Sequence, residues 1–298
     1  MQLGLGTVQF GLNYGVSNTE GRPSEEEVRR ILALAVERRV HVLDTAAAYG
    51  ASEIVLGRCL PRNAPFRVVT KTRPLRECPD TVGATAWVRD GFVQSLDRLG
   101  LESVDALLVH HACDLLGPFG DEMYTELMVI KQSGRAAKIG FSAYNGFDID
   151  AALDRYEIDL VQIPLNVLDQ RLLLGGQMAR LQQRGVEIHV RSVFLQGLLL
   201  MDPMTAPEYF APIRPKLLAW QQALKDRGLT PTQGAFAFAR SLGADVVLAG
   251  VVKTSQLEVN CEDFRLARGK DLDFSGFALN DEIYVNPSRW KLPARFKV

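Results

Sequence analysis

The sequence predicts an α/β fold of the (β/α)8 TIM-barrel class, folded as a single domain over residues 1–298. Eight short apolar runs are separated by longer segments with helical periodicity, and strands buried on both faces are typical of parallel sheets. The length suits one barrel of roughly 250 residues with additions. No internal repeat, low-complexity tract or linker rich in Pro, Gly and Ser divides the chain. A doubly wound open sheet is the alternative arrangement of the same elements.

The predicted strands are the short apolar runs. They lie at Met1–Gly6, Val40–Asp44, Phe66–Lys71, Val104–His110, Ala137–Ser142, Leu160–Ile163, Val186–Val190 and Asp245–Ala249. The predicted helices fill the intervals, at Ser24–Arg38, Thr81–Leu99, Asp121–Ser133, Phe147–Tyr156, Gly176–Arg184, Lys216–Arg227, Thr232–Ser241 and Gln256–Arg268. In the first helix Ser24 is the expected N-cap, and three glutamates follow it, which suits the positive end of the helix dipole.

The ends of the helices carry a second signal. Four helical segments are followed by a glycine, which suits the left-handed position just beyond a helix: Gly100, Gly134, Gly185 and Gly228. The segment Met201–Pro215 contains four prolines and is predicted to be a long loop after the seventh strand. The tail Asn280–Val298 shows no periodicity and is expected to pack over the barrel.

The composition argues against several classes of partner. The chain is 47% hydrophobic and 23% charged, and its formal net charge is −1 without any basic block, so no nucleic-acid partner is expected. It has no stretch of about 18 apolar residues and no signal-peptide pattern, so no membrane span is expected. The four cysteines form no metal-binding pattern, which favours reduced thiols in a cytoplasmic protein without a metal. The sequence gives no indication of the oligomeric state.

Four polar residues follow the second, third and fourth predicted strands. Asp44, Lys71 and His110 each end a strand, and Tyr49 lies in the loop five residues after Asp44. Chemistry in such barrels takes place where the strands end, so one rim would bring these four side chains together. Each residue alone has an ordinary structural explanation, as a turn, a rim or a packed side chain. Their joint placement is what predicts an active site.

The motifs around these residues resemble those of one family. The runs are Leu43–Glu53 with the sequence LDTAAAYGASE, then Leu56-Gly57, Val69-Thr70-Lys71 and Val104–His110 with the sequence VDALLVH. They resemble, in order, the conserved motifs of the aldo-keto reductase family. The resemblance covers nearly the whole chain, from Leu3–Thr7 to Asn286–Trp290.

The resemblance implies an NAD(P)H-dependent oxidoreductase that transfers a hydride between nicotinamide and a carbonyl or alcohol. Tyr49 would be the general acid and base, because the alkoxide that forms on reduction needs a proton. A free tyrosine has a pKa near ~10, and the ammonium group of Lys71 would lower it. Asp44 would hold Lys71, and His110 would hydrogen-bond the carbonyl oxygen.

The resemblance also implies a set of cofactor contacts. Gly6, Thr7 and Asp44 lie on the first two strands, and Gly4 and Gly6 do not complete a GxGxxG motif. Ser142 and Gln162 match positions that hold the carboxamide, whereas Ala143 replaces a common asparagine. The later candidates are Arg191, Ser192, Leu195, Gly197, Gly250, Lys253, Gln256 and Asn260. Arg191 replaces a common aromatic residue, so it would either stack on the nicotinamide or reach an anionic substrate.

The cofactor and the substrate are predicted only in outline. A basic residue common at Gly250 is absent, and Lys253 is the candidate that would bind a 2′-phosphate, so NADP(H) is favoured over NAD(H). The candidate substrate residues are Phe10, Tyr49, Trp87, His110 and His111, and a sugar or other small carbonyl compound is the expected substrate. Two alternatives stay open, a nicotinamide-binding regulatory protein similar to the potassium-channel β subunits, and an unrelated barrel enzyme.

Overall fold

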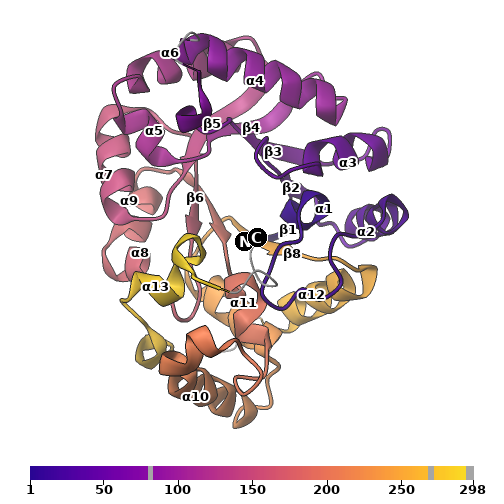
Figure 1. The fold of residues 1–298 in the computed structure, drawn as a ribbon, viewed down its shortest axis with the longest axis vertical. Helices are drawn as coiled ribbons and strands as arrows, with labels where there is room; N and C mark the ends of the chain where they lie inside the picture. Colours follow the sequence, from indigo (N-terminus) through magenta and orange to yellow (C-terminus); the bar gives the residue numbers. More distant parts are fainter. Residues whose placement is uncertain (80–82, 268–271, 293–298) are drawn as a thin grey trace.

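Eight parallel strands close into a barrel in which each strand pairs with its neighbours in the sequence (Figure 1). The structure, a computed structural model, describes residues 1–79, 83–267 and 272–292. The pairing of β1 with both β2 and β8 closes the barrel, which confirms the predicted fold class over the open sheet. The strands are β1 (Gln2–Gly6), β2 (Val42–Asp44), β3 (Arg67–Lys71), β4 (Val104–Val109), β5 (Ala136–Ser142), β6 (Leu160–Pro164), β7 (Glu187–Arg191) and β8 (Val246–Gly250).

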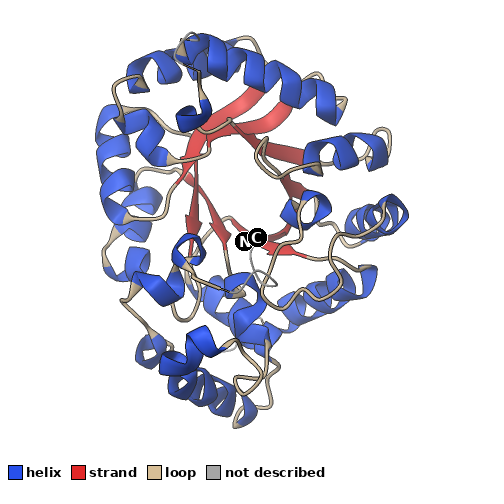
Figure 2. Ribbon diagram, viewed as in Figure 1, coloured by secondary structure: helices blue, strands red, loops and turns tan. Residues whose placement is uncertain are grey.

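The helices surround the strands (Figure 2). The longer ones are α2 (Glu25–Glu37), α3 (Ser52–Cys59), α4 (Ala84–Leu99), α6 (Gly120–Gln132), α7 (Gly146–Arg155), α9 (Gln177–Gln183), α10 (Arg214–Lys225), α11 (Pro231–Ser241) and α12 (Thr254–Leu266). Short helical turns are α1 (Val8–Gly11), α5 (Ala112–Leu116), α8 (Arg171–Leu174) and α13 (Glu282–Val285). All eight predicted helices are present. Thr81 and Arg268, the predicted outer ends of α4 and α12, lie outside the described residues.

The helix ends follow the predicted capping chemistry. The Ser24 side chain accepts a hydrogen bond from the backbone N–H of Glu27, which makes Ser24 the N-cap of α2. The four predicted glycines are left-handed, with φ of 64°, 77°, 66° and 64° for Gly100, Gly134, Gly185 and Gly228. The short helices α1, α3, α5 and α8 were not predicted, because one or two turns show too little periodicity.

The predicted loop Met201–Pro215 is partly wrong. A 3-10 turn spans Glu208–Ile213, and α10 begins at Arg214 with Pro215 in its first turn, where a proline costs no hydrogen bond. The tail packs on this segment, as predicted in outline: Trp290 meets the ring of Phe210 edge-on at 4.9 Å between ring centroids. Residues 293–298 of the tail lie outside the described residues.

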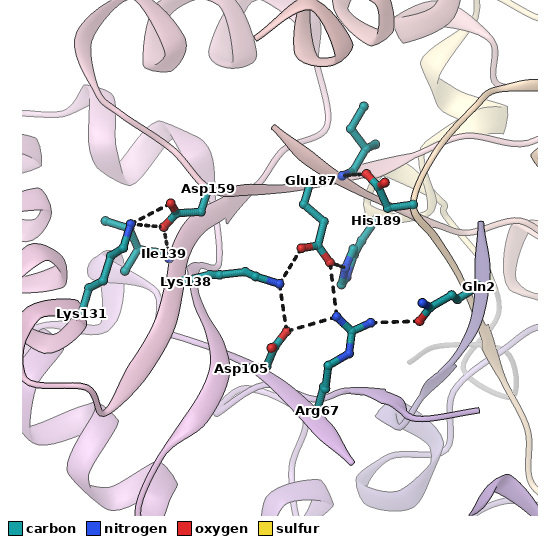
Figure 3. A network of polar contacts seen from close by, with 11 residues as sticks. Gln2, Arg67, Asp105, Lys131, Lys138, Ile139, Asp159, Glu187 and His189 are labelled. Carbon is teal, nitrogen blue, oxygen red and sulfur yellow. Dashed lines mark hydrogen bonds and ion pairs between the residues drawn. The ribbon is translucent and has the colours of Figure 1, made fainter. Parts of the chain in front are cut away.

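Charged side chains form a network on the floor of the barrel, at the amino ends of its strands (Figure 3). Lys138 Nζ lies 2.6 Å from Glu187 Oε2 and 3.5 Å from Asp105 Oδ2. Arg67 lies 3.9 Å from Glu187 and donates a hydrogen bond to Gln2. We call this cluster, with His189 beside it, the floor network. It lies at the opposite end of the barrel from the rim where the strands end.

The register brings the carboxyl ends of the strands to one level. Gly6 of β1 pairs with Asp44 of β2 and with Gly250 of β8, and Ser142 of β5 pairs with Gln162 of β6.

Within the described ranges, no helix is long and apolar enough to cross a membrane. Nor does any group of three or more His, Cys, Asp or Glu side chains in those ranges suit a metal ion.

Candidate active site

A buried ion pair joins the ends of β2 and β3. Lys71 Nζ lies 2.7 Å from Asp44 Oδ1 and donates to the carbonyl oxygen of Thr45 at 2.8 Å. Gln162 Nε2, from β6, donates to the same Asp44 oxygen at 2.7 Å. The side chains of Lys71 and Asp44 are 1% and 6% exposed, so each charge depends on the other for compensation.

Tyr49 lies against this ion pair, in the loop after β2. Lys71 Nζ is 4.9 Å from the centroid of the Tyr49 ring, and the His110 ring meets that ring edge-on at 5.8 Å between centroids. Gly11 of α1 packs against the loop so closely that a Cβ would lie 1.8 Å from the Tyr49 carbonyl oxygen. Gly50 takes the left-handed φ of 55° that turns the chain away. The backbone of α1 therefore fixes where Tyr49 stands.

Burial controls the protonation of these groups. Burial raises the pKa of Tyr49 well above its ordinary value, the charge of Asp44 raises it further, and Arg191 opposes them. The predicted lowering of this pKa by Lys71 is therefore wrong for the protein without a cofactor, because burial outweighs the nearby positive charge. Burial lowers the pKa of Lys71, and Asp44 opposes that shift. Burial, with the charge of Lys71, lowers the pKa of His110 to about 2. His110 is therefore a neutral imidazole near pH 7, with one ring N–H to donate.

A cavity of about 510 Å³ begins at Tyr49 and His110 and extends to the first turns of α12. Loops after β1, β7 and β8 form most of its walls. Many of the predicted site residues line it: Gly6, Thr7, Asp44, Tyr49, His110, Ser142, Arg191, Ser192, Gly197, Gly250, Gln256 and Asn260. The structure thus gathers the predicted catalytic end and the predicted adenosine end in one cavity.

Other predicted residues do not line this cavity. Lys71 lies behind Tyr49, and Gln162, Phe10 and Leu195 are fully buried beside it or in the core. Trp87, a predicted substrate residue, does not line the cavity either. The Arg73 guanidinium stacks on its ring, 3.6 Å from the ring centroid.

His111 and Lys253 lie near the cavity without lining it. The ring of His111 stacks on that of His110 at 4.7 Å between centroids. Lys253 Nζ forms an ion pair of 2.6 Å with Glu20 Oε1. A substrate or cofactor role for these residues would therefore be indirect, or would need a change of side-chain position.

One wall of the cavity was not predicted from the sequence. This wall is the loop after α1, and its lining residues include Tyr14, Ser17, Asn18, Thr19 and Glu20. The available signal was the run Leu12–Gly21, which contains two asparagines and two glycines and follows the first strand at the rim where barrel loops carry function. Gln9, Tyr144 and Gln196 also line the cavity and were not predicted.

The chain matches a family model described as "Aldo/keto reductase family" over residues 2–273. An aldo-keto reductase of Mycolicibacterium vanbaalenii is 33% identical over 190 residues, which are 61% of this chain and 64% of that protein. One of Mycobacterium sp. (strain MCS) is 33% identical over 135 residues, 45% of this chain and 46% of that protein. The chain thus aligns with about half to two thirds of the length of these relatives.

The chain belongs to the aldo/keto reductase family. The predicted family resemblance is confirmed. Solved structures share the fold: an aldo-keto reductase from Bacillus halodurans in its holo form has a TM-score of 0.73 at 21% identity, covering 93% of this chain and 89% of that one. A glycerol dehydrogenase from Gluconobacter oxydans has a TM-score of 0.71 at 22% identity, covering 91% and 87%. At these identities the solved structures show the shared fold.

Arg191 is the most distinctive residue of this aldo/keto reductase at the catalytic end. Its guanidinium carbon is 4.0 Å from the centroid of the Tyr144 ring, and Nε and Nη2 donate to Ser142 Oγ and the Ala143 carbonyl oxygen at 3.4 and 3.3 Å. The groups that it contacts are neutral, and among the described residues Arg191 forms no ion pair. Arg191 therefore brings a positive charge to the cavity, close enough to affect Tyr49.

Two loops of this aldo/keto reductase meet over the cavity. The backbone N–H of Val16 donates to the Gln196 carbonyl oxygen at 3.0 Å, and Gln196 Nε2 donates to the Tyr14 hydroxyl at 3.2 Å. Gln196 has a left-handed φ of 55°, a strained conformation for a residue with a side chain. The contacts across the loops hold that conformation, and they cover part of the cavity.

Proposed function

We propose that the protein is an NAD(P)H-dependent oxidoreductase that interconverts a small carbonyl compound and its alcohol. Tyr49 is the general acid and base, assisted by Lys71, Asp44 and His110. The observation that carries the proposal is the buried pair of Lys71 and Asp44 against the Tyr49 ring, with His110 beside it, at one end of the cavity.

The residues of the cavity fit a nicotinamide dinucleotide. Polar side chains line it from the catalytic end to α12, and two of them, Gln9 and Gln196, carry a buried amide oxygen without a partner in the described structure. Such oxygens suit the hydroxyl and amide groups of a dinucleotide. When bound, the nicotinamide supplies or accepts the hydride.

The chain supplies the proton and the electrostatic stabilisation. The Tyr49 hydroxyl donates its proton to the oxygen of the reduced carbonyl, and the positive charge of Arg191 favours the tyrosinate that remains, against burial and the charge of Asp44. The neutral His110 donates a hydrogen bond to the same oxygen, where negative charge develops. Asp44 holds Lys71 in place and offsets part of its charge. In the opposite direction tyrosinate accepts the proton of the alcohol.

The test is a kinetic assay of Tyr49→Phe. We expect the variant to bind the cofactor like the parent but to lose about 100- to 10,000-fold in turnover, the usual contribution of a positioned proton donor. Turnover is followed at about 340 nm, the nicotinamide absorbance, with aldehydes, ketones and sugars. Full activity of Tyr49→Phe would overturn the assignment of the acid.

The regulatory alternative makes a different prediction in the same assay. A nicotinamide-binding regulatory protein would bind the cofactor and turn over none of the carbonyl compounds.

The polar side chains of His111, Arg191 and Tyr14 near Tyr49 favour a sugar or a small polar carbonyl compound as the substrate. A cytoplasmic location remains a prediction from the sequence. The sequence favours NADP(H), because Lys253 is the candidate to bind a 2′-phosphate. In the structure the ammonium group of Lys253 is paired with Glu20, which counts against that role.

A further inference from the structure

One end of the cavity lies away from the catalytic residues. If the nicotinamide faces Tyr49 and His110, as the proposed function requires, the adenosine half of the dinucleotide lies at the other end. That end is lined by Glu20, Ser255, Gln256, Val259 and Asn260. The charges there decide whether a 2′-phosphate on the adenosine ribose is accepted.

The N-terminus of α12, where an anion would be expected to bind, already holds a carboxylate of the chain. Glu27 of α2 accepts hydrogen bonds on Oε1 from the backbone N–H of Thr254 at 2.6 Å and from its hydroxyl at 2.8 Å. These are the groups that a phosphate would otherwise bind. The Thr254 N–H also holds the pKa of Glu27 below its ordinary value, so this carboxylate is charged at neutral pH.

The neighbouring groups are also satisfied within the chain. Gln256 Oε1 accepts from the backbone N–H of Val252 at 2.7 Å and from that of Lys253 at 3.3 Å. The ammonium group of Lys253 is paired with Glu20 at 2.6 Å. At Gly250 a Cβ would lie 2.4 Å from the side-chain amide of Gln9, so a basic side chain at this position would have to displace Gln9.

The balance of charge at this end is therefore negative or neutral. Among the described lining residues, Arg191 is the sole lysine or arginine, and it belongs to the catalytic end. A ribose 2′-phosphate carries a charge of about −1.5 to −2. By contrast, a free 2′-hydroxyl can donate a hydrogen bond to a carboxylate, as it does in many sites that select NAD.

We propose that this cavity selects NAD(H) over NADP(H), because Glu20 lines its adenosine end, Glu27 occupies the N-terminus of α12 beside it, and Lys253 is paired with Glu20. The inference rests on the proposed function and reverses the cofactor preference that the sequence suggests. Repulsion between a phosphate and one carboxylate a few ångströms away weakens binding by about tenfold. We therefore expect NAD+ to bind at least about tenfold more tightly than NADP+.

Isothermal titration calorimetry of the full chain with NAD+ and NADP+ tests the proposal. Glu20→Gln removes the charge and releases Lys253, so NADP+ should bind about tenfold more tightly to this variant while NAD+ changes little. The double variant Glu20→Gln/Lys253→Met should lose the part of that gain that comes from the released Lys253 and keep the part that comes from removing the Glu20 charge. Glu26→Gln is the matched control, because Glu26 is an exposed glutamate on the same turn of α2 as Glu27. Its selectivity should equal that of the parent chain.

The outcomes separate the two proposals. Equal or tighter binding of NADP+ by the parent chain overturns the NAD(H) inference but leaves the oxidoreductase standing. An unchanged ratio in Glu20→Gln also overturns the inference, because selection would not depend on that carboxylate. If neither nucleotide binds, the proposed function fails and the inference fails with it. ADP-ribose and its 2′-phosphate, titrated in the same way, should show the same preference without any contribution from the nicotinamide.

Discussion

The close contact between Gly11 and the loop of Tyr49 makes a sharp test of the proposed active site. A Cβ at Gly11 would lie 1.8 Å from the carbonyl oxygen of Tyr49, 2.4 Å from the amide nitrogen of Ser52 and 2.8 Å from that of Ala51. All three atoms belong to the backbone, so no side-chain rotation relieves the contact. Ordinary contacts begin at 3.4 Å, so Gly11→Ala must move the loop by about 1.5 Å.

The size of the expected effect follows from that displacement. A shift of ~1 Å in a reacting group costs on the order of 100-fold in rate. Overpacking of this kind also costs about 1–3 kcal/mol of stability, which a folded domain of this size can tolerate. We therefore expect Gly11→Ala to remain folded, to lower kcat about 100-fold and to change cofactor affinity much less, because Tyr49 is one of many cavity residues.

Steady-state kinetics and cofactor titration measure the two effects separately, and circular dichroism checks the fold. Gly83→Ala is the matched control, since Gly83 has a negative φ and, within the described residues, no atom beyond its chain neighbours lies within 4 Å of its added Cβ. It should leave kcat unchanged. If folded Gly11→Ala kept the kcat of the parent chain, either the loop tolerates the shift or the position of Tyr49 does not govern turnover, and the proposed role of α1 would be refuted.

Three further predictions concern the charged groups. Lys71→Met should abolish turnover and destabilise the fold by about 3–5 kcal/mol in a denaturant titration, because it leaves Asp44 buried without its cation; adding Asp44→Asn should restore stability but not turnover. The pH profile of kcat/KM should show no inflection from His110 between about pH 5 and 8, because its pKa of about 2 keeps it neutral there, and a His110-dependent inflection near ~6.5 would contradict this. The hydrogen bonds from His189 and Lys138 hold the pKa of Glu187 at about 2, below the ~4.3 of a free glutamate. Ionised Glu187 therefore stabilises the fold above about pH 4.3, and this contribution is lost as the pH falls towards 2. Urea midpoints of Glu187→Gln should therefore change less over this acid range than those of the parent chain, whereas Glu37→Gln on the exposed face of α2 should behave like the parent.

The parts of the molecule that the sequence predicted well are those that repeat or that are encoded locally. Each strand is one apolar run, and the side chain that follows it reaches the common rim. For this reason Asp44, Lys71 and His110 were placed together without knowledge of any contact. The helix ends were equally local, as the N-cap at Ser24 and the left-handed Gly100 illustrate. Short helices such as α3 escaped prediction because about two turns do not establish a period.

The adenosine end could not be predicted in this way, because its character depends on pairs of residues far apart in the chain. Lys253 taken alone is a free cation that favours NADP(H). Its partner Glu20 lies in the loop after α1, and Glu27, which occupies the N-terminus of α12, comes from α2. Nothing in the local sequence around Lys253 reveals these partners, since barrel closure alone brings β1 and its loop beside β8. The same closure that makes the catalytic end predictable thus makes the charge of the cofactor end a property of the fold, and Glu20→Gln separates the two contributions.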